Sequence, residues 1–190
     1  MRNLARFLIP ASGRHMTVPA LVSQGVFSLM MGVCLAAGTG QAQTRSDSAP
    51  AILNVTVTKV TDGDSLRAGP LRLRLYGIDA PEAKQTCHDH DGAIYGCGQA
   101  ATAKLAELVN IGDRVECELI DIDRYKRLIA RCRNDRVDLN RQMVRSGWAV
   151  AYQRYSRAFI ADEHIARNDR AGLWAGQFQR PEDWRRSTRK

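Results

Sequence analysis

One stretch, LRLRLYGIDAPE at 71–82, constrains the fold more than any other part of the chain. Its leucines alternate with arginines and a tyrosine, and this period of two predicts a β-strand with one apolar and one polar face. A glycine ends the strand, and Asp79 and Glu82 follow in a turn. Arg74, on the polar face, therefore lies near two carboxylates. This combination is typical of a site that cleaves phosphodiesters with a hard cation, although a solvated strand and an ordinary turn also fit.

Four other stretches have the composition or the alternation of β-strands. They lie at 52–60, 65–68, 114–120 and 127–133, and the first is rich in β-branched residues. Asp-Gly at 62–63 lies between the first two stretches, where it predicts a hairpin turn.

Three segments are predicted to be helical. Residues 98–110 place their apolar side chains on one face, and a short helix follows at 139–147. A longer helix begins with Ser156 as its N-cap and ends before Gly172. Five strands with these helices predict a small closed β-barrel with about three packed helices, an α+β fold that is mainly β.

The first 42 residues predict a cleaved export signal. They contain three arginines, no acidic residue and the apolar run VFSLMMGVCLAAG, and small residues precede a cut after Ala42. A membrane anchor is the alternative, since the apolar run can be extended to nearly the length of a spanning helix. Residues 43–51 then form a flexible linker, 52–178 the folded domain and 179–190 a basic C-terminal tail. The protein is expected to be exported, to the periplasm or the medium.

The chain is basic, with 28 lysines and arginines against 20 acidic residues and a net charge of +8. Such a charge favours a polyanionic partner, although many basic proteins bind no nucleic acid. The segment DIDRYKR, between the last two predicted strands, brings charge and an aromatic ring together at Asp123, Arg124, Tyr125 and Arg127. Taken alone, this segment fits a solvated hairpin tip.

Four cysteines remain once the leader is removed: Cys87, Cys97, Cys117 and Cys132. An even set in an exported chain predicts two disulfides, for which three pairings are possible. We favour Cys87–Cys97 and Cys117–Cys132, because the second pair lies on like faces of two consecutive strands. The alternative is a zinc site, since histidines and aspartates occupy 88–91, but the sequence lacks the closely spaced cysteine pairs that zinc sites usually have.

Taken together, these motifs resemble the staphylococcal nuclease, or thermonuclease, family. The resemblance runs from about Asn54 to Trp174. It rests on DGDS at 62–65, RLYGIDAPE at 74–82, DRYKR at 123–127 and the segments VRSGWAVAY and GLW. Each motif is weak alone, but all occur in order and at family spacing. The resemblance implies a five-stranded barrel of the oligonucleotide-binding (OB-fold) type with three helices, in agreement with the elements predicted above.

The resemblance also implies roles for individual residues. Asp64 and Asp79 match calcium-binding carboxylates, and the backbone carbonyl of Ala80 matches a further calcium ligand. Glu82 matches the general base that activates water. Two arginines match the groups that hold the scissile phosphate, and two tyrosines match aromatics of the nucleotide pocket; these are Arg74, Arg127, Tyr125 and Tyr152.

Several positions depart from the family pattern. Ala80 replaces a threonine, Lys126 replaces the glycine that usually precedes the second arginine, and Arg154 stands where a tyrosine is expected. If position 126 requires a positive φ, a lysine there strains the turn and alters the aim of Arg127.

The activity implied by the resemblance is that of a calcium-dependent, sugar-nonspecific endonuclease that hydrolyses DNA and RNA and leaves 3′-phosphate ends. Single-stranded substrates are expected, because a stacked duplex hides its bases from aromatic side chains. We expect a monomer without a stable protein partner. Two alternatives remain open: a catalytically inactive nucleic-acid-binding module on the same barrel, and a basic envelope protein with a structural role.

Overall fold

The computed structural model describes residues 49–189, which lie within the compact unit Ser46–Lys190. The predicted export signal at 1–42 and most of the predicted linker at 43–51 lie outside the described residues. Between residues 49 and 189, no helix has both the length and the apolar character needed to cross a membrane.

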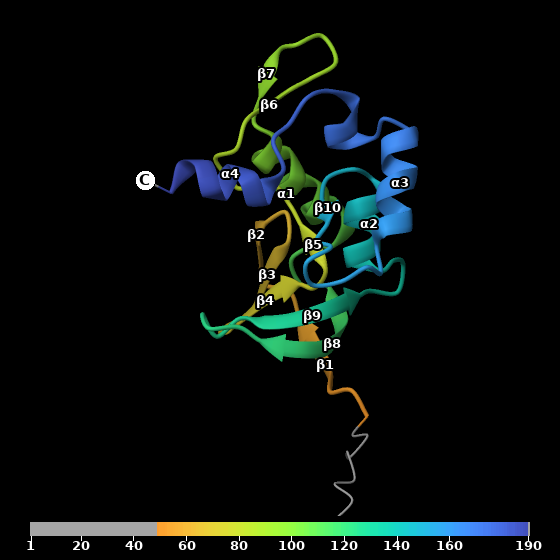
Figure 1. The fold of residues 1–190 in the computed structure, drawn as a ribbon. Helices are drawn as coiled ribbons and strands as arrows, with labels where there is room; N and C mark the ends of the chain where they lie inside the picture. The colour runs from red at the N-terminus through yellow and green to blue at the C-terminus, as the bar shows by residue number, and fades with distance from the viewer. Residues whose placement is uncertain (1–48, 190) are drawn as a thin grey trace, which may run out of the picture. The chain divides into compact units, whose positions relative to one another are not determined.

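A six-stranded sheet forms the body of this unit (Figure 1). Its strands follow the order β1-β8-β9-β4-β3-β2, and neighbours are antiparallel except for the parallel pair β4 and β9. The strands are β1 (Ile52–Thr56), β2 (Lys59–Asp62), β3 (Ser65–Ala68), β4 (Leu71–Leu75), β8 (Arg114–Ile122) and β9 (Leu128–Arg133).

The two outermost strands, β1 and β2, are halves of one bent segment of chain. At the bend, the amide of Val57 donates to the carbonyl of Asp113 beside β8, and the amide of Thr58 donates to the carbonyl of Arg67 in β3. The segment thus joins both sides of the sheet and curls it into the predicted barrel of five segments. The prediction of one continuous strand over 52–60 is wrong, because the chain changes its neighbour at the buried Val57.

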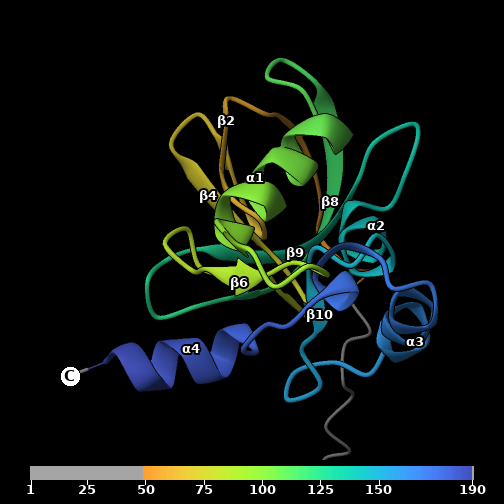
Figure 2. The same cartoon turned by 90° about the horizontal axis from the view of Figure 1, so that it is seen from above.

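The described residues form four α-helices and one 3-10 helix. They are α1 (Cys97–Leu108), α2 (Leu139–Arg145), α3 (Ile160–Asn168), η1 (Gly172–Ala175) and α4 (Pro181–Thr188). Figure 2 shows α1 lying across the curled sheet, with α2 and α3 together on one side and α4 apart from them. The last helix falls within the stretch predicted as a basic tail.

The predicted helix from Ser156 starts too early. The helix α3 begins at Ile160, after Phe159. The hydroxyl of Ser156 accepts a hydrogen bond from the amide of Ala158, so it closes a local turn and does not cap the helix.

The alternation in β4 sorts its side chains as predicted. Leu73 and Leu75 are 1% exposed, whereas Arg72 and Arg74 lie on the other face. Each buried leucine contributes roughly 1.5–3 kcal/mol through the hydrophobic effect. The same core receives side chains from the other strands and from α1 and α2, among them Leu66, Leu105, Val115, Leu139 and Met143.

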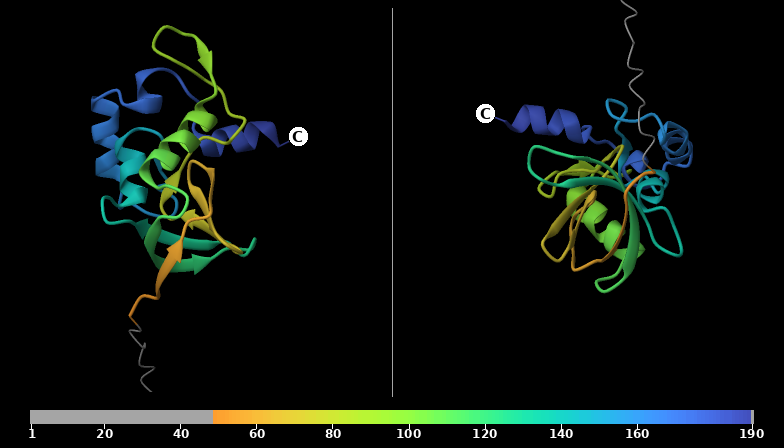
Figure 3. Two further views of the ribbon diagram at one scale, coloured as in Figure 1. Left: turned by 180° about the vertical axis from the view of Figure 1, so that it is seen from behind. Right: turned by 90° about the horizontal axis from the view of Figure 1, so that it is seen from below.

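Both favoured disulfides are confirmed. Cys117 and Cys132 are register partners in β8 and β9, with Cα atoms 4.1 Å apart. Cys87 and Cys97 are bonded with Cα atoms 5.6 Å apart, and they tie α1 to a short hairpin. That hairpin consists of β6 (Cys87–His88) and β7 (Ile94–Tyr95), and Figure 3 shows it at the end of the unit opposite β1. The alternative of a zinc site built on these cysteines is therefore wrong.

Candidate active site

Two aspartates with almost fully buried carboxylates meet beside β4. Asp64 lies in the turn between β2 and β3, and Asp79 lies in β5 (Ile78–Asp79), which pairs with β10 (Val150–Ala151). Their side chains are 4% and 1% exposed. Arg74 of β4 donates from Nη1 to Oδ1 of Asp64 at 2.8 Å and from Nη2 to Oδ1 of Asp79 at 3.0 Å. One guanidinium therefore joins the two carboxylates that the sequence predicts as metal ligands.

The turn that carries Asp64 packs closely against Ala80 and Ala101, and Gly63 makes this approach possible. A Cβ atom at Gly63 would lie 2.7 Å from Cβ of Ala80 and 2.8 Å from Cβ of Ala101, so no larger residue fits. The amide of Ala80 donates to Oδ2 of Asp64 at 3.2 Å, and the hydroxyl of Ser65 donates to Oδ1 at 3.0 Å. These contacts hold the Asp64 carboxylate in place before any ligand arrives.

Burial and proximity change the pKa values in this cluster. Burial raises the pKa of Asp79, hydrogen bonds from Arg185 oppose that rise, and the charge of Asp64 adds to it. Burial and the neighbouring Asp64 raise the pKa of Asp62 to about 6. For Arg74, burial lowers the pKa, but the charges of Asp64 and Asp79 outweigh it and the pKa is raised. The acidic groups are therefore crowded enough to gain from additional positive charge.

A second guanidinium reaches the cluster from α4, and sequence reasoning missed it. Arg185 donates from Nη1 and Nη2 to the two oxygens of Asp79, both at 2.9 Å, and from Nη1 to Oε1 of Glu82 at 2.8 Å. Glu82 lies at the edge of the cluster with 42% of its side chain exposed. The helix could have been predicted from PEDWRR, which has proline at its start, acids in its first turn and arginines in its last. The sequence pattern gives no sign that Arg185 faces Asp79.

The other predicted phosphate-binding arginine, Arg127, lies apart from this cluster. Its Nε donates to Oδ2 of Asp123 at 2.7 Å, and its guanidinium carbon lies 5.7 Å from the centre of the Tyr125 ring. Among residues 49–189, no hydrogen bond joins Arg127 to the buried aspartates or to Glu82. The structure thus brings together Asp64, Arg74, Asp79 and Glu82, and it leaves Arg127 on the β8–β9 hairpin.

The turn before Arg127 has the backbone conformation that the family's glycine suggests. Lys126 has a φ of 60°, in the left-handed region where a side chain is strained. The neighbouring Tyr125 is 54% exposed at the hairpin tip. Position 126 therefore has the positive φ that was expected to strain a lysine.

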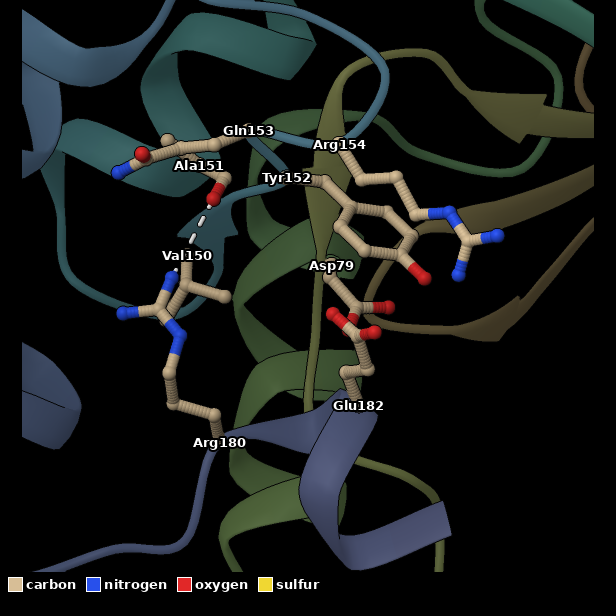
Figure 4. Close-up of a pocket in the computed structure, with 8 residues that line it drawn as sticks. All are labelled: Asp79, Val150, Ala151, Tyr152, Gln153, Arg154, Arg180 and Glu182. Atoms are coloured by element: carbon tan, nitrogen blue, oxygen red, sulfur yellow. Dashed lines mark hydrogen bonds between the residues drawn. The ribbon is translucent and has the colours of Figure 1, made fainter. Parts of the chain in front are cut away.

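The other predicted aromatic, Tyr152, lines a pocket of about 260 Å³ next to the buried carboxylates. Figure 4 shows the Tyr152 ring beside Arg154, with the carboxylates of Asp79 and Glu182 facing each other below it. The Tyr152 ring packs edge-on against the Tyr155 ring, with 4.8 Å between the ring centres. The guanidinium carbon of Arg185 lies 6.0 Å from the centre of the Tyr152 ring. The two predicted aromatics therefore occupy different places, one in the pocket and one on the hairpin.

Residues 72–176 match the family described as Staphylococcal nuclease homologue, and this match covers more than half of the chain. The chain belongs to the staphylococcal nuclease family. This assignment agrees with the barrel and with the grouping of Asp64, Arg74, Asp79 and Glu82 within or close to the matched range.

Several curated proteins of bacteria and plants are similar to this staphylococcal nuclease homologue. It is 34% identical to the succinoglycan biosynthesis protein ExoI of Rhizobium meliloti (strain 1021) over 120 residues. These residues make up 62% of this chain and 63% of that protein. It is 30% identical to the probable staphylococcal-like nuclease CAN2 of Oryza sativa subsp. japonica over 129 residues, or 66% of this chain and 32% of the rice protein. An endonuclease of Haemophilus influenzae, described as uncharacterized, is 31% identical over 138 residues, covering 68% and 71%. The chain thus spans less than two thirds of the Rhizobium protein and about a third of the rice protein.

Members of the staphylococcal nuclease family generally depend on a metal ion, and the carboxylates of this chain fit a hard divalent cation. The side chains of Asp64 and Asp79 offer oxygen atoms, the ligands that such cations prefer. In this structure the guanidinium groups of Arg74 and Arg185 form ion pairs with these carboxylates. A separate group of Asp89, His90 and Asp91 has ligand atoms within 4.8 Å of one another on the β6–β7 hairpin. Two of its three residues are exposed, and exposed acidic groups are common without an ion.

Proposed function

We propose that this protein is a calcium-dependent phosphodiesterase that hydrolyses DNA and RNA as a sugar-nonspecific endonuclease and leaves 3′-phosphate ends. One observation carries the proposal: a single guanidinium, that of Arg74, joins two buried carboxylates next to a more exposed third carboxylate, Glu82. The family assignment supports nuclease chemistry at this place.

Asp64, Asp79 and the backbone carbonyl of Ala80 are the groups we assign to the calcium ion. When bound, the ion supplies positive charge that neutralises the phosphodiester and lowers the pKa of a coordinated water. Both oxygens of Asp79 accept hydrogen bonds from Arg185. A further cation at these oxygens therefore competes with Arg185 for the Asp79 carboxylate.

Glu82 is our general base. A base must face water and lie near the reacting phosphate, and the Glu82 side chain is 42% exposed while Arg185 links it to Asp79. The Glu82 carboxylate takes a proton from the attacking water. When Arg185 leaves, the Glu82 carboxylate loses the hydrogen bond from Nη1 of Arg185 and is free to accept one from the attacking water.

We assign to Arg74 the task of binding the phosphate as negative charge builds in the transition state, with the N–H groups that its bonds to Asp64 and Asp79 leave over. A guanidinium donates to two oxygens at once and stays protonated, which an ammonium group cannot match. We assign the same task to Arg127, which has to turn from Asp123 to reach the phosphate. Loss of one such donor typically costs about 10²–10³ in rate, or roughly 3–4 kcal/mol.

The aromatic side chains favour single-stranded substrates. Tyr152 in the pocket and Tyr125 on the hairpin each offer a ring on which a base can stack, and stacking contributes roughly 1–3 kcal/mol per base. Binding then falls as salt is added, because phosphate contacts release bound counterions. We further propose that the protein acts as an exported monomer, in the periplasm or the medium, without a stable protein partner.

A catalytically inactive nucleic-acid-binding module is the second candidate. Two contacts favour it: Asp123 holds Arg127 away from the cluster, and Arg185 occupies Asp79 and Glu82. If both contacts persist when nucleic acid binds, the carboxylates are blocked and the barrel binds without cleaving.

The test is cleavage of end-labelled single-stranded DNA in Ca²⁺ and in chelator. The wild-type protein is compared with Glu82→Gln and with Glu107→Gln, a control that removes an exposed carboxylate on α1 whose ion-pair partner is Lys104. We expect cleavage only in Ca²⁺, its loss in Glu82→Gln and its retention in Glu107→Gln. Binding without cleavage in Ca²⁺ supports the inactive module.

A further inference from the structure

Three cationic side chains lie opposite one another on adjacent strands of the barrel. Lys59 of β2 is paired in register with Arg67 of β3, and Arg67 is paired with Arg72 of β4. All three side chains are exposed, whereas their neighbours Leu66 and Leu73 are 1% exposed. The three cations therefore cross the outer face of the sheet in a line, which we call the basic row.

This arrangement is unfavourable for the isolated barrel. Like charges directly opposite each other on neighbouring strands destabilise a sheet. None of the ion pairs within residues 49–189 includes Lys59, Arg67 or Arg72. Charge repulsion that the fold itself does not offset is expected where a surface binds an external ligand. Because the three side chains are cations, the ligand they attract is an anion.

The basic row is continuous with the candidate active site. Arg72 and Arg74 are two residues apart in β4, so they project from the same face of the sheet, and Arg74 holds the two aspartates. Arg72 also donates to the carbonyl of Tyr125 at the tip of the β8–β9 hairpin. The guanidinium carbon of Arg124 lies 5.0 Å from the centre of the Tyr125 ring. Positive charge thus extends from the buried carboxylates to both the row and the hairpin.

We propose that the basic row binds phosphates of the nucleic-acid strand that continues beyond the scissile bond. Neighbouring strands lie about 4.8 Å apart, so the row spans roughly 10 Å, the axial length of about three nucleotides in one strand of DNA. Cations that meet only phosphates position a strand without reading its sequence. The inference rests on the proposed nuclease function and adds a substrate class to it: polynucleotides longer than the active site alone can hold.

The experiment compares two double variants that each remove one lysine and one arginine. Lys59→Gln with Arg67→Gln shortens the basic row but keeps Arg72 and its contact with the hairpin. Lys104→Gln with Arg114→Gln is the control, on α1 and β8. Binding of labelled oligothymidylates of about 3 and about 15 nucleotides is measured by fluorescence anisotropy in chelator at several salt concentrations. Oligouridylate and phosphatidylserine vesicles are tested in parallel.

We expect the row variant to bind the longer oligonucleotide about tenfold more weakly, with a smaller loss for the trinucleotide. Its salt dependence should fall by about 1.4 in the slope of log K against log salt, since each phosphate contact on a single strand contributes about 0.7. The control variant should match the wild type, and oligouridylate should behave like oligothymidylate because both present phosphates. The row variant should melt at a temperature at least as high as the wild type, because a like-charge pair has been removed.

Three results would overturn the inference. These are equal affinities of the row and control variants, equal losses for short and long oligonucleotides, and a row-dependent binding of vesicles without any effect on oligonucleotides. The last result would assign the row to an anionic membrane surface. The proposed function fails in a different way, if the wild-type protein cleaves neither oligonucleotide in Ca²⁺ whatever the row contributes to binding.

Discussion

The two arginines that contact Asp79 come from very different parts of the fold. Arg74 lies within β4, paired in register with Ser65 of β3 and flanked by buried leucines. Arg185 lies on α4, a helix in which only Pro181 is buried. Both place a nitrogen about 3 Å from Oδ1 of Asp79, at 3.0 and 2.9 Å. The cluster thus has one side fixed by the barrel and another side held mainly by its own ion pairs.

This difference predicts different roles for Arg74 and Arg185. Because the register of the sheet fixes Arg74, it can keep its place while a substrate binds and reacts. Arg185 is held by ion pairs with Asp79 and Glu82 and lies on a helix with little buried surface, so we expect that another cation can replace it. Arg127 belongs with Arg185 in this respect, since an ion pair with Asp123 on a hairpin holds it.

Replacement of the fixed arginine should have the largest effect. Arg74→Lys should lower kcat by about 10²–10³, nearly as much as Arg74→Ala, because an ammonium group cannot donate to two phosphate oxygens in the same geometry. The measurement is kcat on single-stranded DNA, with circular dichroism to verify folding. Turnover of the lysine variant near that of the wild type would show that bidentate donation is unnecessary.

Replacement of the exchangeable arginine should increase cation affinity. Arg185→Gln should tighten Ca²⁺ binding about tenfold, since hydrogen bonds between charged groups contribute roughly 1.5–3 kcal/mol and part of that competes with the ion. Isothermal titration calorimetry without nucleic acid measures this directly. Arg186→Gln is the matched control, because Arg186 pairs with Glu182 and Asp183 of its own helix. Unchanged or weaker Ca²⁺ binding in Arg185→Gln would mean that Arg185 does not compete with the ion.

The ion pair that holds Arg127 should make stability depend on pH. Burial raises the pKa of Asp123, but hydrogen bonds from the backbone and side chain of Arg127 outweigh it, and the pKa is lowered. Such a carboxylate stabilises the fold above its unfolded pKa of about 3.9, and this contribution is lost as the pH falls through the folded pKa. Asp123→Asn should therefore reduce the free energy of unfolding by about 1 kcal/mol near neutral pH and by less in acid.

Urea unfolding at about pH 7 and about pH 3 tests this dependence on either side of the unfolded pKa. Asp135→Asn serves as the control, since Asp135 is an exposed aspartate in the connection that follows β9. A loss of stability that is equal at both pH values would contradict the role assigned to the Asp123 carboxylate.

The smallest effect is expected at the strained turn before Arg127. Lys126→Gly should raise the free energy of unfolding by up to about 1 kcal/mol, because glycine adopts a φ of 60° without a steric penalty. Lys126→Ala keeps the Cβ atom and should bring no gain, which makes it the control. An equal gain in both variants would show that the lysine side chain, and not backbone strain, is responsible.

The comparison also separates what the sequence could predict from what it could not. Alternation in the stretch from Leu71 to Leu75, together with the turn that follows, was enough to place Arg74 near Asp79. Similar alternation put Cys117 and Cys132 on like faces of two consecutive strands, which favoured the disulfide that the register of β8 and β9 allows. These features are local, or they join segments whose periodicity shows which faces meet.

The remaining features depend on long-range packing that leaves no periodic pattern. The bend at Val57 lies inside an unbroken run of strand-forming residues, so nothing marks the change of partner. Ser156 has the chemistry of an N-cap but closes a turn before α3 begins at Ile160. Arg185 lies 106 residues from Asp79, and its contact depends on how α4 docks after the segment that precedes it.

The most direct test of the account is the Ca²⁺ dependence of DNA cleavage in the wild type and in Arg185→Gln. We predict cleavage that requires Ca²⁺ in both proteins, with half-maximal activity at roughly tenfold lower Ca²⁺ in the variant. This result would link the buried carboxylates, the cation and the exchangeable arginine in one site. Cleavage that ignores Ca²⁺, or a variant whose Ca²⁺ requirement equals that of the wild type, would contradict it.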